Sequence, residues 1–179
     1  MKNNALSKLS ISADFKTRKM IGNGLIMSSI SYIIQVYGAC SGYLLDMLQV
    51  QQNIAACHIT KNPYMTPTKT LLRQCDWLSI RQLIMYHSLV SFYKVLKVKK
   101  PEYMAKRVKY VERESRTTDR LTVIDSSARH FHTVTASRGY FPRTIKHWNS
   151  LPFSIRETEN VTRFKCKLKN YIRDTIQVK

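Results

Sequence analysis

The stretch that decides the fold is residues 79–98, which read SIRQLIMYHSLVSFYKVLKV. Ser79 is suited to cap a helix start, because its hydroxyl oxygen can accept a hydrogen bond from an otherwise unbonded N–H of the first turn. Apolar side chains then cover nearly every face of the helix: Ile80, Leu83, Ile84, Met85, Leu89, Val90, Phe92, Tyr93, Val95 and Leu96. A helix that is apolar all round lies buried rather than on a surface. The stretch therefore predicts the longest helix of the chain, at the centre of a helical core.

Upstream of this helix, the apolar residues also recur with a helical period. Residues 16–37 fit a helix better than a strand, and a second helix follows over residues 44–59. Pro63 ends the second helix, since proline disfavours helix in the residue before it. Thr68 is suited to cap a short helix that runs through Cys75. The region upstream of residue 79 is thus predicted to be helical throughout.

Downstream, the composition changes from apolar to basic. Residues 97–116 carry eight Lys and Arg against three Glu, and residues 116–127 are polar and typical of turns. Residues 129–135 alternate weakly between polar and apolar, which predicts a short β element. Pro142 suits the first turn of a further helix, and Asn160 can cap the last one. The last helix has an apolar stripe made by Val161, Phe164, Leu168, Tyr171, Ile172 and Ile176.

These elements together predict an all-α fold, a compact bundle of five to seven helices with at most one short β element near residues 129–135. No internal repeat and no Gly/Ser-rich linker occurs in the sequence. We predict four parts in chain order: a loose N-terminal leader (1–15), a helical, thumb-like core (16–98), a basic and polar connector (99–128) and a C-terminal extension with basic helices (129–179).

Net charge is the unusual bulk property of the chain. Thirty Lys and Arg against 11 Asp and Glu give a formal net charge of +19, whereas the hydrophobic content of 44% is ordinary for a globular protein. A domain tolerates such self-repulsion best when a polyanion neutralises it. Nucleic acid is the first candidate partner and an anionic membrane surface the second. A third interpretation is that an AT-rich genome inflates the lysine content without functional meaning.

The segment between Lys19 and Asp46 has no charged residue and raises the question of a membrane span. A spanning helix needs roughly 20 mostly apolar residues, and Gly, Ser, Asn and Gln interrupt this segment repeatedly. We therefore expect a buried core helix and no membrane partner. No apolar run follows Met1, so no signal peptide is expected. Four cysteines without close pairing (Cys40, Cys57, Cys75 and Cys166) predict reduced, buried thiols in an intracellular protein, nuclear or cytoplasmic and not secreted.

The sequence contains no recognisable catalytic motif. Polymerase chemistry needs paired aspartates that hold two metal ions, but the aspartates of this chain, at positions 14, 46, 76, 119, 125 and 174, are isolated. The close Cys or His pairs of a structural zinc site are also missing. Cys75 and His87 are interpreted as core residues, although His130 and His132 could place two rings on one side of a strand. We expect no catalytic residue, no metal, no cofactor and no small-molecule substrate.

Basic residues interleaved with aromatic residues favour nucleic-acid binding, because cations neutralise phosphates and aromatic rings stack on unpaired bases. The predicted phosphate contacts are Lys97, Lys99, Lys100, Lys106, Arg107, Lys109, Arg143, Lys146, Lys165, Lys167 and Lys169. Trp148 has two interpretations. Burial among Ile145, Leu151 and Phe141 is favoured, and base stacking is the alternative.

Several short sequence blocks run through the chain in order. Residues 140–152 read YFPRTIKHWNSLP, and Phe164-Lys165 and Leu168-Lys169 follow. Upstream are SYIIQVYG (31–38), LQVQQNIAA (48–56), Leu71 to Arg81 with Trp77-Leu78, and Tyr93-Lys94 with PEYM (101–104). The order and spacing of these blocks resemble the C-terminal region of reverse transcriptases from non-LTR (LINE-type) retrotransposons.

In that family this region follows the palm and serves as thumb and C-terminal extension. The resemblance implies a non-catalytic fragment of an RNA-directed DNA polymerase that grips the template–primer backbone through Lys and Arg. The implied partners are RNA, DNA or an RNA–DNA hybrid, and the missing palm domain. Two departures are Tyr37 in place of Trp and Cys57 in place of Arg, which removes one cation from a helix face. The alternatives are an inert structural or protein-interaction relic of the element, and a membrane-associated protein anchored through residues 20–45.

Overall fold

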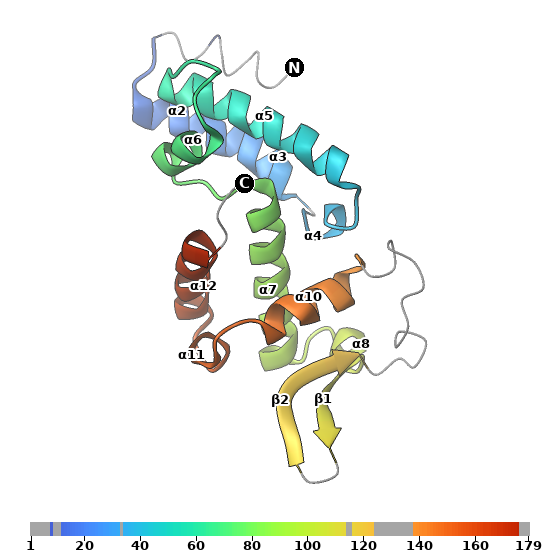
Figure 1. Cartoon of the computed structure of the whole chain (residues 1–179). Coiled ribbons are helices and arrows are strands. Elements are labelled where there is room, and N and C mark those ends of the chain that lie inside the picture. The colour runs from blue at the N-terminus through green and yellow to red at the C-terminus, as the bar shows by residue number, and fades with distance from the viewer. Residues whose placement is uncertain (1–7, 9–11, 33, 114–115, 124–137, 176–179) are drawn as a thin grey trace. The chain divides into compact units, whose positions relative to one another are not determined.

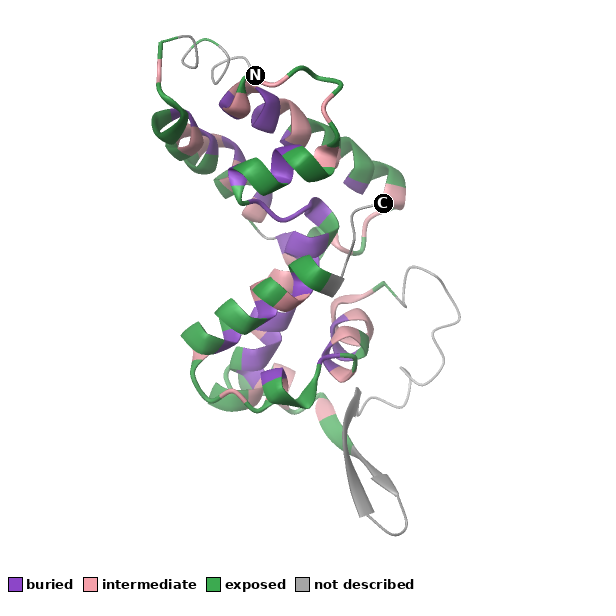
Figure 2. Cartoon of the chain, turned by 60° about the vertical axis from the view of Figure 1, so that its left-hand side comes forward, coloured by how far each residue is buried: buried purple, intermediate pink, exposed green. Residues whose placement is uncertain are grey.

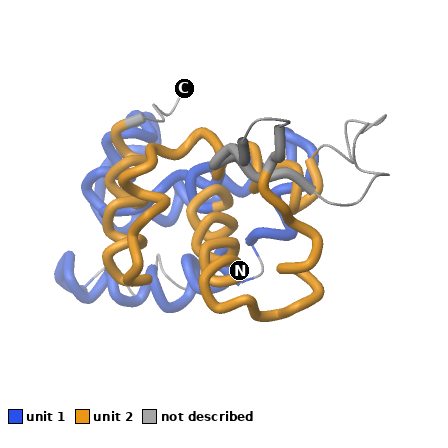
Figure 3. Tube along the Cα trace, turned by 90° about the horizontal axis from the view of Figure 1, so that it is seen from below, with its two compact units in different colours: residues 1–83, 176–179 blue, residues 84–175 orange. Residues whose placement is uncertain are grey.

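The structure is a computed structural model that describes residue 8 and residues 12–32, 34–113, 116–123 and 138–175. The described chain is mostly helical, which confirms the predicted fold class. It divides into two compact units, shown in different colours in Figure 3: unit 1 comprises residues 1–83 and 176–179, and unit 2 comprises residues 84–175. No helix of the described residues is long and apolar enough to cross a membrane.

Unit 1 is built from helices that follow the predicted order (Figure 1). They are α2 (Phe15–Gly22), the π-helix η1 (Asn23–Met27), α3 (Ser28–Ser31), α4 (Ile34–Tyr37), α5 (Gly42–Thr60), α6 (Thr68–Cys75) and the first turn of α7 (Ile80–Val98). Helix α5 packs against α2, η1 and α6. The predicted helices over 44–59 and 68–75 are therefore confirmed. The predicted helix over 16–37 is confirmed over residues 16–31, where α2, η1 and α3 follow one another without a break, and it ends at the extended backbone of Tyr32 before the separate α4.

Close packing in unit 1 depends on Gly22 and on a buried arginine. A Cβ atom at Gly22 would lie 2.5 Å from Cδ1 of Ile59, so a larger residue at this position would force the fully buried Ile59 side chain to move. Arg18 is buried beside the end of α5, where its Nε donates a hydrogen bond of 2.7 Å to the carbonyl oxygen of Ile59. Carbonyl groups in the last turn of a helix lack helical partners, and a cation there is favourable. Arg18 therefore fixes the start of α2 to the end of α5.

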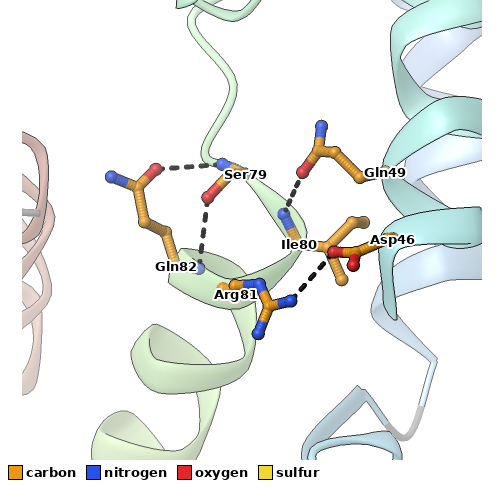
Figure 4. Close-up of polar contacts among 6 residues, drawn as sticks. All are labelled: Asp46, Gln49, Ser79, Ile80, Arg81 and Gln82. Atoms are coloured by element: carbon orange, nitrogen blue, oxygen red, sulfur yellow. Dashed lines mark hydrogen bonds and ion pairs between the residues drawn. The ribbon is translucent and has the colours of Figure 1, made fainter. Parts of the chain in front are cut away.

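The start of α7 is held by a reciprocal cap and by α5 (Figure 4). The backbone N–H of Ser79 donates to Oε1 of Gln82 at 3.0 Å, and the N–H of Gln82 donates to Oγ of Ser79 at 3.4 Å. This is the capping-box pattern, so the predicted role of Ser79 is confirmed. From α5, Oε1 of Gln49 accepts a hydrogen bond of 2.9 Å from the N–H of Ile80, and Asp46 pairs with Arg81 at 2.8 Å.

Unit 2 combines the rest of α7 with the C-terminal helices and two strands. The elements are α8 (Glu102–Ala105), β1 (Val108–Arg113), β2 (Arg116–Val123), α10 (Tyr140–Asn149), α11 (Phe153–Arg156) and α12 (Val161–Thr175). Buried residues extend along most of α7 (Figure 2). The predicted cap of the last helix is confirmed, because Oδ1 of Asn160 accepts a hydrogen bond of 2.8 Å from the N–H of Thr162.

Tyr93 is the centre of the unit 2 core. Its ring stacks on Phe164 of α12 with a centroid distance of 4.2 Å, and both side chains are fully buried. Its hydroxyl donates toward the carbonyl oxygens of Thr158 and Glu159, at 2.5 and 2.6 Å, just before α12 begins. Because the ring and the hydroxyl both contact the C-terminal region, Tyr93 fixes α12 against α7.

The prediction for residues 116–127 was wrong where the structure describes them. Residues 116–123 form strand β2, which pairs antiparallel with β1 from Val108↔Val123 to Arg113↔Arg116, with an irregularity between Tyr110 and Glu112. Strand β1 contains two Val, strand β2 contains three Thr and one Val, and β-branched residues favour the extended backbone. The high charge of this region concealed that pattern. The predicted β element at 129–135, including His130 and His132, lies outside the described residues.

The cysteines are all free, but they differ in exposure. Cys57 and Cys75 are buried, Cys40 is half-buried and Cys166 is exposed. Burial raises the pKa of the Cys57 thiol, and it raises that of Cys75 to about 11. The expectation that all four thiols are buried was wrong for Cys166, because this residue lies outside the apolar stripe of α12.

Candidate nucleic-acid interface

Six of the predicted phosphate contacts form one cluster in unit 2, which we call the link patch: Lys97, Lys99, Lys100, Lys106, Arg107 and Lys109. They occupy the end of α7, the connection to α8 and the start of β1, and all six are exposed. The backbone at Lys99 is left-handed (φ 55°). Nζ of Lys106 lies 3.4 Å from Glu102, but both side chains are well exposed, so this pair contributes little to stability.

Arg107 connects the link patch to α10. Its guanidinium carbon lies 5.0 Å from the centroid of the Phe141 ring, within the range of a cation–π contact. Strand β2 also packs against α10. The basic segment and the strands are therefore positioned beside α10 within unit 2.

Helix α10 carries two predicted contacts that differ in exposure. Lys146 is exposed, whereas Arg143 is half-buried and donates a hydrogen bond of 3.1 Å from Nη1 to the carbonyl oxygen of Arg138. Burial lowers the pKa of His147 and, as a smaller effect, Arg143 and Lys146 lower it further. His147 is therefore neutral near pH 7 and adds no charge to this surface.

Helix α12 carries three further predicted contacts, which we call the α12 patch: Lys165, Lys167 and Lys169. The first two are exposed and Lys169 is half-buried. Nζ of Lys167 donates to the carbonyl oxygen of Ser154 at 3.2 Å. Phe164, Leu168 and Ile172 are fully buried and belong to the predicted apolar stripe of α12. The lysines flank this stripe, with Lys165 and Lys169 one turn apart on one side and Lys167 on the other.

Lys165 of the α12 patch lies beside α7, well before the end of α7 where the link patch begins. Lys165 is close enough to His87 for its charge to lower the pKa of that histidine, after the larger effect of burial. Lys97 follows His87 by ten positions, which corresponds to about 15 Å along a helix. Lys167 instead contacts α11 through Ser154, next to Phe153 in the wall of the pocket that Lys97 also lines.

A pocket opens beside the link patch, with a volume of about 340 Å³. Four elements supply its walls: the end of α7 (Leu96 and Lys97), β1 (Tyr110), α10 (Trp148) and the region of α11 (Phe153, Arg156 and Glu157). The favoured interpretation of Trp148 is confirmed: it is 6% exposed, and its ring centroid lies 5.5 Å from that of Phe92. Its remaining exposed part reaches the pocket.

Sequence reasoning missed Phe153, Arg156 and Glu157 as site residues. A local signal was present, because Phe153 and Arg156 are three residues apart directly after Pro152, which places them on one face of a helical turn. The guanidinium of Arg156 lies 5.8 Å from the Phe153 ring centroid. The approach of Tyr110 and Lys97 to this turn depends on the tertiary structure.

No group of three His, Cys, Asp or Glu side chains that could hold a metal ion occurs among the described residues. No protein-family model matches the chain, and no curated protein or solved structure does. The resemblance to non-LTR reverse transcriptases therefore stays a prediction that rests on the sequence blocks.

Proposed function

We propose that this chain is a non-catalytic nucleic-acid-binding module, derived from the thumb and C-terminal region of a retrotransposon reverse transcriptase. Unit 2 would bind the phosphate backbone through the link patch, Lys146 and the α12 patch. The observation that carries the proposal is exposure: nine of the eleven predicted contacts are exposed, and Arg143 and Lys169 are half-buried.

Charge supports the same proposal. Unit 2 contains 20 Lys and Arg against 8 Asp and Glu, a net charge of +12 over 92 residues. Each phosphate that a cation neutralises releases condensed counterions, so affinity for a polyanion rises as salt falls. Backbone contacts of this kind carry little sequence information. We therefore expect binding that depends strongly on salt and weakly on sequence.

The test is binding of the purified chain to an RNA–DNA hybrid duplex over a series of salt concentrations. We expect a dissociation constant in the micromolar range or tighter at low salt, with a linear fall of log affinity against log salt. Replacing Lys165, Lys167 and Lys169 together by Ala should flatten that slope by roughly one unit for each phosphate that the helix no longer neutralises. An unchanged slope would remove α12 from the interface. No binding at low salt by the folded chain would favour the inert relic.

A further inference from the structure

The pocket beside the link patch is large enough to hold a small ring system, and aromatic and charged side chains share its walls. Its volume of about 340 Å³ lies within the range of roughly 300–1,000 Å³ that is usual for small-ligand sites. Three aromatic side chains from separate elements, Tyr110, Trp148 and Phe153, take part in its walls.

Two of these aromatic rings are exposed beside the cavity. Tyr110 is 53% exposed and Phe153 is 56% exposed, whereas Trp148 is almost fully buried. Burial of a large aromatic side chain contributes more free energy than burial of a small one. Two exposed rings at one pocket therefore leave apolar surface that a planar ligand could cover. Stacking on aromatic rings is the usual way in which proteins hold unpaired bases without sequence preference.

The charged side chains at the pocket indicate which part of a nucleotide would enter it. The carboxylate of Glu157 would repel a phosphate, but it can accept a hydrogen bond from an exocyclic amino group such as N4 of cytosine. The guanidinium of Arg156, beside Phe153, offers a second planar surface for stacking. The exposed ammonium group of Lys97 is suited to the phosphate of the same nucleotide. The side chains of the pocket therefore favour a base edge inside the pocket and a phosphate beside Lys97.

We propose that this pocket holds an unpaired nucleobase of single-stranded nucleic acid. The base stacks against Tyr110 and Phe153, Glu157 binds its amino group, and Lys97 binds its phosphate. The inference rests on the proposed function and deepens it, because Lys97 belongs to the link patch. It adds a site for bases to a surface that is otherwise expected to contact only the backbone.

The experiment compares three labelled probes in binding titrations with the full chain: a short oligodeoxycytidine, the same strand with its bases removed, and a blunt RNA–DNA hybrid duplex. We expect the intact strand to bind more tightly than the abasic strand, which keeps the phosphates. Phe153→Ala and Tyr110→Ala should each weaken binding of the intact strand about tenfold, as expected when one stacking ring is removed. Binding of the abasic strand and the duplex should not change.

Tyr103→Ala is the matched control, because Tyr103 lies on α8, is 68% exposed and is not part of the pocket wall. Equal affinity of the wild type for the intact and abasic strands would overturn the inference and leave backbone binding in place. An equal loss of affinity for all three probes in the Phe153→Ala variant would also overturn the inference. If the wild type bound none of the probes, the proposed function would fail, and the inference with it.

Discussion

The two units share a helical construction but differ in charge. Unit 1 has 10 Lys and Arg against 3 Asp and Glu over 87 residues, and between Lys19 and Lys61 its only formally charged residue is Asp46. Unit 2 has about twice as many basic residues, and most of those singled out as phosphate contacts are exposed. The net charge of the chain is therefore distributed unequally between its two units.

Several exposed residues between Lys19 and Lys61 in unit 1 are apolar. Tyr32, Val36, Tyr43, Met47 and Val50 are each more than half exposed. Tyr43, Met47 and Val50 follow one another on α5 at helical spacing, so they form a stripe. Exposed apolar surface of this kind does not attract a polyanion. Nucleic-acid binding is therefore expected mainly in unit 2.

The largest expected effect comes from breaking the core of unit 2. Phe164→Ala removes the ring that stacks on Tyr93 and should lower the free energy of unfolding by about 3–5 kcal/mol. Chemical denaturation measures this change, and binding to the hybrid duplex should disappear with the structure of unit 2. The control is Phe153→Ala, which removes an exposed ring and should change the free energy of unfolding by about 0.5 kcal/mol or less. Similar effects of the two variants would contradict the placement of Phe164 in the core.

A smaller effect should come from unit 1 and should leave binding intact. Gly22→Ala places a methyl group against Ile59 and should lower the free energy of unfolding by about 1–3 kcal/mol. Gly24→Ala is the matched control, because nothing lies within 4 Å of its added Cβ. It should be neutral or stabilise the helix by up to about 1 kcal/mol. Duplex affinity should stay the same in both variants, and a selective loss in Gly22→Ala would place unit 1 in the interface.

The smallest expected effect is on the pH dependence of unit 2. Burial lowers the pKa of His87 and His147 in the folded state, with a smaller contribution from neighbouring cations. Because the ordinary pKa of about 6.5 applies to the unfolded chain, the unfolded state binds protons first as the pH falls. The free energy of unfolding is therefore unaffected by these two residues above about pH 7, and their protonation in the unfolded chain lowers it as the pH falls through about 6.5.

Denaturation midpoints measured from pH 8 to pH 5.5 test this expectation. The double variant His87→Gln/His147→Gln should lose less stability over that window than the wild type. A wild type that became more stable on acidification would contradict the direction of both pKa shifts.

Local signals made much of the helical fold predictable. Ser79 and Asn160 were predictable as the caps of α7 and α12, because a helix start depends on side chains a few residues away. The predicted cap of α6 was wrong: Thr68 is the first residue of the helix, Pro67 holds the cap position without a side-chain hydrogen bond, and the Thr68 hydroxyl accepts one from Asn53 instead. Fully buried Leu89, Phe92 and Tyr93 lie within the stretch whose all-round apolar pattern predicted a central helix.

The remaining features required tertiary information. Strands β1 and β2 stabilise each other through pairing, which a single charged segment does not reveal. Half-burial of Arg143 depends on its surroundings in the fold, which composition does not describe. The pocket joins Lys97, Tyr110 and Phe153 from three separate elements, so no local spacing could predict it.

The measurement that tests the central claim most directly compares two triple variants with an equal reduction in charge. One replaces Lys97, Lys100 and Lys109 of unit 2 by Gln, and the other replaces Lys16, Lys69 and Arg73 of unit 1 by Gln; all six side chains are exposed. Binding to the hybrid duplex over a salt series should weaken in the unit 2 variant, with a slope flatter by up to about three units. The unit 1 variant should bind like the wild type. Equal losses of affinity in the two variants would show that net charge alone drives binding and would contradict a specific interface in unit 2.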